Sequence, residues 1–169
     1  MTLAAMKVAI TGSHGLIGTA LTARLRADGD TVVGLVRGPS GPGTIGWDPA
    51  SGRLDPAALA GVDAVVNLAG AGIGDGRWTA ARRAEITSSR IALTEVLSTA
   101  IAAAEPAPAV LLSGSAVGYY GDRGAEELTE ASGPGTGFLA DLCRQWEQAT
   151  GAAEAAGVRV AHLLSLIHI

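Results

Sequence analysis

Short apolar runs along the chain alternate with longer segments in which apolar residues recur every three or four positions. The short runs are nearly continuous, as in strands buried on both faces, and they predict strands at 6–11, 31–36, 44–47, 64–68, 110–113 and 158–164. The longer segments predict a helix that starts at Leu16 and stops at Gly29, and further helices at 79–104 and 138–156. Proline ends the second of these helices, and Gly157 ends the third.

Strands that alternate with helices favour right-handed crossovers and a parallel sheet. The chain has 169 residues, which is enough for one domain of ordinary size. We therefore predict an α/β fold with a doubly wound parallel sheet, whose strands lie in the order 3-2-1-4-5-6. In such sheets a ligand binds outside the carboxyl ends of the strands, where the strand order reverses. Here that point lies between the first and fourth strands.

Composition excludes several classes of protein. With 48% hydrophobic and 17% charged residues, the chain can form a sizeable core and is not disordered. A formal net charge of −4 argues against a nucleic-acid partner. No apolar run is long enough to span a membrane and the N-terminus lacks a signal-peptide pattern, so we expect a cytoplasmic protein without a membrane partner. The single cysteine and the scattered histidines lack metal-ligand spacing, so we expect no metal.

Three glycines, Gly12, Gly15 and Gly18, stand at a spacing of three where the first strand ends and the first helix begins. In that context the first allows a tight turn, the second lets backbone approach a pyrophosphate, and the third lets the helix pack on the sheet. The helix N-terminus adds free N–H groups and a positive dipole end. The pattern predicts a dinucleotide site, and a glycine-rich turn that binds nothing is the alternative. The predicted contacts are Gly12, Ser13, Gly15, Leu16, Ile17 and Gly18.

Seven stretches carry a resemblance to a known family: "ITGSHGLIG", "WDP", "VDAVVNLAGAGIGDGRW", "SSR", "SGSAVGYYGDRG", "LTEASGPG" and "FLADLCRQWE". In their order and spacing they resemble the extended and atypical members of the short-chain dehydrogenase/reductase superfamily, and in particular its NAD(P)-dependent epimerase/dehydratase-like group. The resemblance implies that residues 1–163 form a Rossmann domain that binds a nicotinamide dinucleotide and lacks a substrate-binding C-terminal portion. It also implies an unidentified small-molecule substrate and a homodimer packed through the helices at 79–104 and 138–156.

The last six residues, "LSLIHI", stand where the resemblance leads us to expect a turn after the sixth strand. They resemble the translation of a transposon-type sequencing adaptor. We therefore expect residues 164–169 to be a non-native tail, and we assign them no function.

The end of the second strand bears on the choice of cofactor, because it carries Arg37 and no acidic residue. A carboxylate there holds the ribose 2′-hydroxyl of NAD, whereas a guanidinium can bind a 2′-phosphate. We therefore predict NADP(H) over NAD(H), with a solvated Arg37 as the alternative. Asn67, at the end of the fourth strand, either contacts the cofactor or bridges strands in the core. The remaining predicted cofactor contacts are Leu68, Ala69, Gly70 and Arg90.

For catalysis, the resemblance implies a serine or threonine after the fifth strand that polarises a carbonyl, and a tyrosine four residues before a lysine that delivers a proton. Ser115 matches the serine position, and Ser113 is the weaker substitute. The tyrosine–lysine pair is missing, because the only lysine is Lys7 in the first strand. A phenol needs a nearby cation to lower its pKa toward the working pH. Tyr119 is therefore our second catalytic candidate, with Tyr120 as a substitute and Arg77 or Arg90 as the cation, and simple packing of the tyrosine rings is the alternative.

These observations favour an NADP-binding oxidoreductase or epimerase-like protein of atypical type. The missing tyrosine–lysine pair supports the alternative, a non-catalytic dinucleotide-binding or sensing module. Cys143 has no histidine–acid partner, so we predict that it packs in the core rather than acting as a nucleophile. We predict that Arg82 and Arg83 lie on a solvated helix face.

Overall fold

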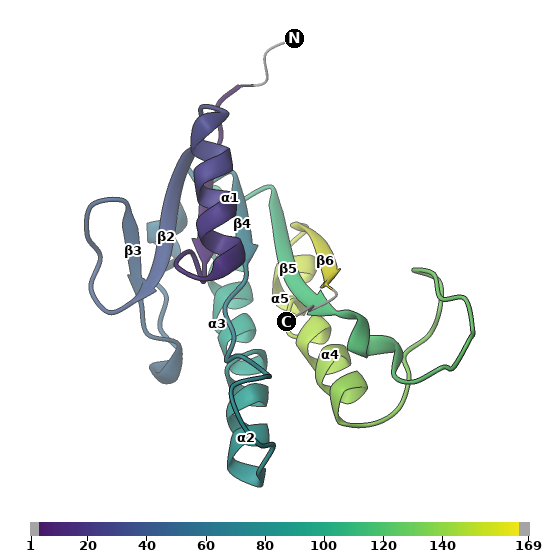
Figure 1. The fold of residues 1–169 in the computed structure, drawn as a ribbon. Coiled ribbons are helices and arrows are strands. Elements are labelled where there is room, and N and C mark those ends of the chain that lie inside the picture. The colour runs from purple at the N-terminus through teal and green to yellow at the C-terminus, as the bar shows by residue number, and fades with distance from the viewer. Residues whose placement is uncertain (1–3, 166–169) are drawn as a thin grey trace.

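A computed structural model describes residues 4–165 and contains one sheet of six parallel strands with helices on both faces (Figure 1). The strands are β1 (Lys7–Thr11), β2 (Thr31–Arg37), β3 (Thr44–Trp47), β4 (Ala64–Asn67), β5 (Val110–Ala116) and β6 (Arg159–Ser165). Their order in the sheet is β3-β2-β1-β4-β5-β6, so the predicted doubly wound sheet is confirmed. The order reverses between β1 and β4, where Thr11 lies opposite Asn67 at the carboxyl ends of the strands.

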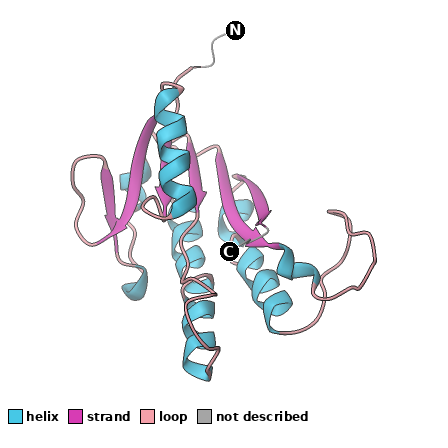
Figure 2. Cartoon of the chain, in the orientation of Figure 1, coloured by secondary structure: helices cyan, strands magenta, loops and turns pink. Residues whose placement is uncertain are grey.

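Helices cover the two faces of the sheet (Figure 2), and apolar side chains from alternate strand positions pack against them. On one face, Leu25 of α1 (Leu16–Ala27) packs against a cluster from β1, β2 and β4. On the other face, α3 (Ile91–Ala102) and α5 (Gly151–Ala155) contribute side chains to the larger cluster. Fully buried Leu97 of α3 is one of them, and its burial stabilises the fold by about 2 kcal/mol relative to exposure.

The prediction of one helix at 79–104 is wrong, because α2 (Ala80–Ser88) ends before α3 begins. Ser89 lies at the break, where its hydroxyl donates to the Ile86 carbonyl at 3.1 Å and accepts from the Ala71 amide at 3.0 Å. Serine side chains that bond to backbone groups offer the chain an alternative to the helical ladder. The break therefore depends on a partner from a distant loop.

The prediction of one helix at 138–156 is also wrong, because α4 (Phe138–Gln148) and α5 are separate helices. The Thr150 hydroxyl donates to the Glu147 carbonyl at 2.6 Å, which draws the chain into a tighter turn at this place. Gly151 follows directly, and glycine weakens a helix interior because it loses more conformational freedom than other residues.

Strand boundaries differ from the prediction chiefly at β5, which continues past residue 113 to Ala116. It does so because it pairs residue by residue with β6, ending with Ala116 opposite Ser165. Of the predicted tail at 164–169, the first two residues belong to β6, and residues 166–169 lie outside the described part of the chain. No helix within residues 4–165 has the length and apolar character of a membrane span.

Candidate functional site

The turn between β1 and α1 depends on glycine at two of its three glycine positions. Gly12 has a φ of 66°, and a Cβ there would lie 3.0 Å from the carbonyl carbon of Leu68. A Cβ on Gly18, in the first turn of α1, would collide with the Gly12 carbonyl oxygen. Gly15 differs, because its φ of −73° suits any residue and a Cβ would meet only the Gly12 oxygen, at 3.3 Å. Gly12 and Gly18 therefore shape the turn, whereas Gly15 leaves the space beside it open.

The N-terminus of α1 presents backbone N–H groups at this turn. Gly15 is its N-cap and has no side chain to accept from them, and the first helical turn holds no acidic residue. Leu16 and Ile17 are 91% and 60% exposed, so the first helical residues face solvent. Ser13 lies across the turn, where its hydroxyl fills the space that a Cβ on Gly34 of β2 would need. Such a helix end, with its positive dipole and free amides, favours a bound anion.

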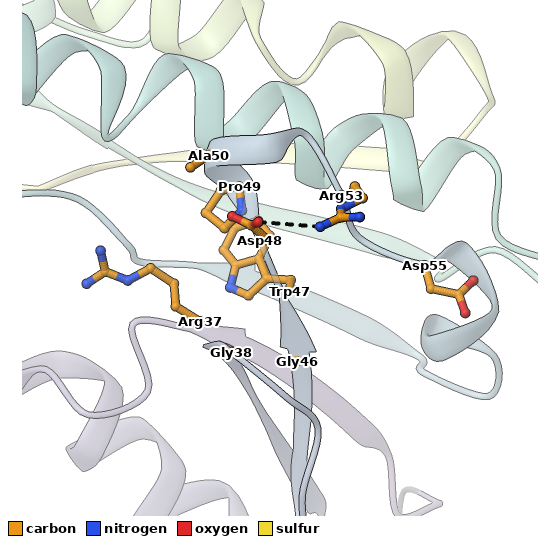
Figure 3. Close-up of a pocket in the computed structure, with 9 residues that line it drawn as sticks. All are labelled: Arg37, Gly38, Gly46, Trp47, Asp48, Pro49, Ala50, Arg53 and Asp55. Atoms are coloured by element: carbon orange, nitrogen blue, oxygen red, sulfur yellow. Dashed lines mark ion pairs between the residues drawn. The ribbon is translucent and has the colours of Figure 1, made fainter.

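A pocket of about 460 Å³ opens at the carboxyl ends of β2 and β3, next to buried Trp47 (Figure 3). Asp48 in this pocket is already engaged, because the Ser51 hydroxyl donates to it at 2.6 Å and Arg53 lies 3.9 Å away. The hydrogen bond from Ser51 holds the pKa of Asp48 below its ordinary value. Arg37 extends away from the Asp48–Arg53 pair (Figure 3) and forms no ion pair with an acid among residues 4–165. Its guanidinium is thus available to a ligand.

A buried hydrogen-bond network fixes the backbone where the strand order reverses. Asn67 is fully buried, accepts from the Thr11 hydroxyl at 2.8 Å and donates to the Thr94 hydroxyl at 2.9 Å. It also lies 3.3 Å from the Ser113 hydroxyl, to which it donates. The Thr11 oxygen accepts from the next two backbone amides, at residues 68 and 69, at 3.0 and 3.1 Å. Of the two roles expected for Asn67, the structure shows the bridge between strands.

Arg90 lies at the break between α2 and α3 and is only 8% exposed. Its guanidinium carbon lies 5.2 Å from the Trp146 ring centroid, and a Cβ on Gly70 would lie 3.2 Å from that carbon. One guanidinium nitrogen donates to the Ile86 carbonyl at 3.2 Å, but no carboxylate in the described chain pairs with it. Burial lowers the pKa of Arg90, which reflects a cation that has lost water without gaining an anion. A buried, unpaired guanidinium is suited to an anionic ligand.

Ser115, at the carboxyl end of β5, is 2% exposed and donates from its hydroxyl to Glu147 Oε1 of α4 at 2.6 Å. Glu147 is not among the site residues expected from the sequence. The available signal was its place in "FLADLCRQWE", four residues after Cys143 and thus on the same helix face. Burial raises the pKa of the Cys143 thiol, which is 3% exposed, so this cysteine packs in the core as predicted.

Tyr119 lies in the short 3₁₀ helix Val117–Tyr120 that follows β5. Its ring packs edge-on against Tyr120 with 5.3 Å between the centroids. The Tyr120 hydroxyl donates to the Thr129 carbonyl at 3.1 Å and so anchors the long loop at 121–137. Packing of the Tyr119 ring is thus evident, and its proton-donating role stays a prediction.

Arg82 is not the solvated residue that the sequence led us to expect, because only 18% of its side chain is exposed. It pairs with Glu85 at 2.6 Å and with Asp75 at 3.3 Å, and it donates to the Gly72 carbonyl. These contacts pin the loop after β4 to α2. Arg83 is exposed, as predicted.

Fold and site together define the class of protein. A doubly wound parallel sheet with a glycine turn at its switch point, followed by an uncapped helix N-terminus, is a Rossmann-type dinucleotide-binding domain. The chain matches the model of the NAD dependent epimerase/dehydratase family over residues 8–163, and it belongs to that family. The resemblance noted in the sequence is confirmed.

Two relatives show what share of a family member's length the chain covers. An epimerase family protein of Mycobacterium bovis is 50% identical over 154 residues, which cover 90% of this chain and 50% of that protein. The human epimerase family protein SDR39U1 is 37% identical, with 85% and 48% covered. The chain therefore spans about half the length of these relatives.

Solved structures agree with the family assignment. The nucleoside-diphosphate sugar epimerase of Corynebacterium glutamicum superposes with a TM-score of 0.82 at 41% identity, covering 95% of this chain and 34% of that one. Human SDR39U1 isoform 2, solved with NADPH, gives a TM-score of 0.75 at 37% identity, covering 86% and 48%.

Proposed function

We propose that this chain binds NADP(H) along the carboxyl edge of the sheet, as the cofactor-binding part of a nicotinamide-dependent oxidoreductase or epimerase with an unidentified substrate. The observation that carries the proposal is the β1–α1 turn, where Gly12 at a positive φ and a bare Gly15 leave room beside an uncapped helix N-terminus. The NADPH in the human relative's structure supports the choice of nucleotide. Calorimetry with NADPH tests the proposal, and absence of binding would contradict it.

The residues present fit such a cofactor along one edge of the sheet. The turn and first helical amides would hold the pyrophosphate, Arg37 the 2′-phosphate, and Arg90 a negative charge near the segment after β4. That segment consists of Leu68, Ala69 and Gly70, and two of its amides are already bonded to Thr11, so it would contact the cofactor through its other atoms. When bound, the dinucleotide would supply a hydride donor or acceptor. The full set of proposed contacts is Gly12, Ser13, Gly15, Leu16, Ile17, Gly18, Arg37, Leu68, Ala69, Gly70 and Arg90.

A non-catalytic binding module is the second candidate, and the missing tyrosine–lysine pair favours it. The two candidates share the cofactor site and differ only in whether hydride is transferred. Tight NADPH binding without turnover of any carbonyl or alcohol would favour the module. Turnover of a carbonyl or alcohol by the wild type, together with loss of that turnover in Ser115→Ala, would favour the enzyme.

Arg37→Ala tests the choice between the two cofactors. We expect the NADPH affinity to fall about 10-fold to 30-fold, because a charge-assisted bond to the 2′-phosphate contributes about 1.5–2 kcal/mol. NADH lacks this phosphate, so its affinity should change by less than about twofold. Calorimetric titration of both nucleotides measures the two effects.

The matched control for Arg37→Ala is Arg24→Ala, which removes an equally cationic side chain from the exposed face of α1, where it pairs with Asp28. This control should leave both affinities unchanged. An equal loss of NADPH and NADH affinity in Arg37→Ala would show that Arg37 does not read the 2′-phosphate.

Arg90→Met separates a ligand-binding role of Arg90 from a structural one. We expect the free energy of unfolding to stay the same or rise by about 1 kcal/mol, because an unpaired buried cation is removed while contact with Trp146 is kept. NADPH affinity should fall about tenfold. Denaturant unfolding and calorimetry measure the two quantities, and a variant that is both less stable and unchanged in affinity would refute the role.

A further inference from the structure

The hydrogen bond between Ser115 and Glu147 has a fixed direction. A carboxylate only accepts hydrogen bonds, so the 2.6 Å contact uses the single hydrogen of the Ser115 hydroxyl. What Ser115 then offers to a ligand is an oxygen lone pair. This is the reverse of the role expected from the family resemblance, in which the serine donates to a substrate carbonyl.

The pair lies at the carboxyl edge of the sheet, because Ser115 stands near the end of β5 and Glu147 reaches it from α4. The charge of Glu147 raises the pKa of the Cys143 thiol and the charge of Arg90 lowers it, so these three side chains lie near one another. Ser115 joins them through its hydrogen bond to Glu147. Tyr119 lies on the short helix that follows β5. Within this cluster Glu147 is the one carboxylate that touches Ser115.

We infer that Ser115 and Glu147 form a proton-accepting pair, and that the substrate presents an O–H group to Ser115 rather than a bare carbonyl. The inference rests on the proposed function, because it needs an oxidised nicotinamide dinucleotide as the hydride acceptor. A secondary alcohol loses hydride from its carbon to that acceptor, and its hydroxyl proton passes to Ser115 as the Ser115 proton passes to Glu147. The C–H and O–H bonds break, a C=O bond forms, and Glu147 returns the proton to water. Ser115 is thus the catalytic residue and Glu147 its positioning and proton-holding partner.

A second pocket, lined by residues of the segment after β5 and of the start of α4, indicates a suitable probe. It measures about 450 Å³ and is lined by apolar groups that include Trp78, Phe138 and Leu139. Trp78 and Phe138 meet edge to face, with 5.7 Å between their ring centroids. Gly118 lines this pocket, and a Cβ there would lie 3.9 Å from the sulfur of Cys143, which precedes Glu147 by four residues in α4. A flat apolar ring that bears one oxygen fits this arrangement, so we choose 1-indanol and its ketone, 1-indanone.

The experiment compares the affinities of these two compounds for the chain saturated with 2′-phospho-ADP-ribose, which is NADP without its nicotinamide and so transfers no hydride. We expect 1-indanol to bind about fivefold more tightly than 1-indanone, which corresponds to one net hydrogen bond of about 1 kcal/mol. In Glu147→Gln the amide can donate to Ser115 and free the Ser115 hydrogen. The preference should then vanish or reverse, which a purely structural role of Glu147 would not produce. Ser115→Ala should bind both compounds equally.

The matched control is Glu154→Gln on α5, which removes a carboxylate that contacts Thr150 and should keep the preference for 1-indanol. NADPH affinity, measured first, separates the two hypotheses. Without NADPH binding the proposed function itself fails. With NADPH bound, an equal or greater affinity for 1-indanone in the wild type, or failure of both compounds to bind, overturns the role of the pair alone. A preference that survives in Glu147→Gln also overturns it.

Discussion

Gly15→Asp should abolish NADPH binding and leave the fold as stable as that of the wild type. Residue 15 is the N-cap of α1, with a φ of −73° and a ψ of 173°, a conformation that aspartate adopts readily. A carboxylate at this place bonds to the helix amides and complements the helix dipole. It would occupy the same amides that the pyrophosphate needs and would repel its charge. We expect the affinity to fall at least about 100-fold, or about 2.8 kcal/mol.

Calorimetry with NADPH and thermal unfolding of the same samples measure the two effects of Gly15→Asp. Gly15→Ala is the control, because it adds a Cβ 3.3 Å from the Gly12 oxygen without adding charge. Its affinity should fall by no more than about tenfold. If the folded aspartate variant binds NADPH as tightly as the wild type, the cofactor does not lie at this turn.

The fold could be predicted from sequence because its determinants are local. A strand buried on both faces reads as an apolar run wherever it occurs, and alternation with helices leaves few topologies. The helix breaks could not be predicted in the same way. Ser89 interrupts the helix partly because its hydroxyl finds the Ala71 amide, a partner 18 positions away that only the folded chain provides. Propensity alone gives no sign of such a contact.

The same distinction holds within the site. The turn at Gly12–Gly18 was predictable, because its geometry depends on neighbouring residues. Arg82 was misjudged, because its partners Gly72 and Asp75 come from a loop that folds back onto α2. Glu147 was missed for a related reason. Its contact with Ser115 spans 32 positions and depends on how α4 packs against β5.

Asn67→Leu should lower the free energy of unfolding by about 3 kcal/mol, the largest stability effect that we expect from one side chain. Leucine has the same branching as asparagine, although it is larger, and it leaves the buried hydroxyls of Thr11, Thr94 and Ser113 without their amide partner. Each unsatisfied buried group costs about 1–3 kcal/mol, and rearrangement of the hydroxyls recovers part of this. Denaturant unfolding measures the loss, which should appear as a lower midpoint at an unchanged slope.

The chain contains its own control for this argument, because the Thr22 hydroxyl in α1 is buried and has no hydrogen-bond partner among the described residues. Thr22→Val removes a polar group that gains nothing in the folded state, so it should raise the free energy of unfolding by about 0.5–1 kcal/mol. If both substitutions change the free energy of unfolding in the same direction, the burial of polar atoms alone explains both changes. If the two changes in the free energy of unfolding have opposite signs, the hydrogen bonds of Asn67 stabilise the sheet where its strand order reverses. NADPH affinity should then fall in Asn67→Leu and not in Thr22→Val. Of these two residues only Asn67 bonds to Thr11, whose hydroxyl holds the backbone amides of residues 68 and 69 beside the β1–α1 turn.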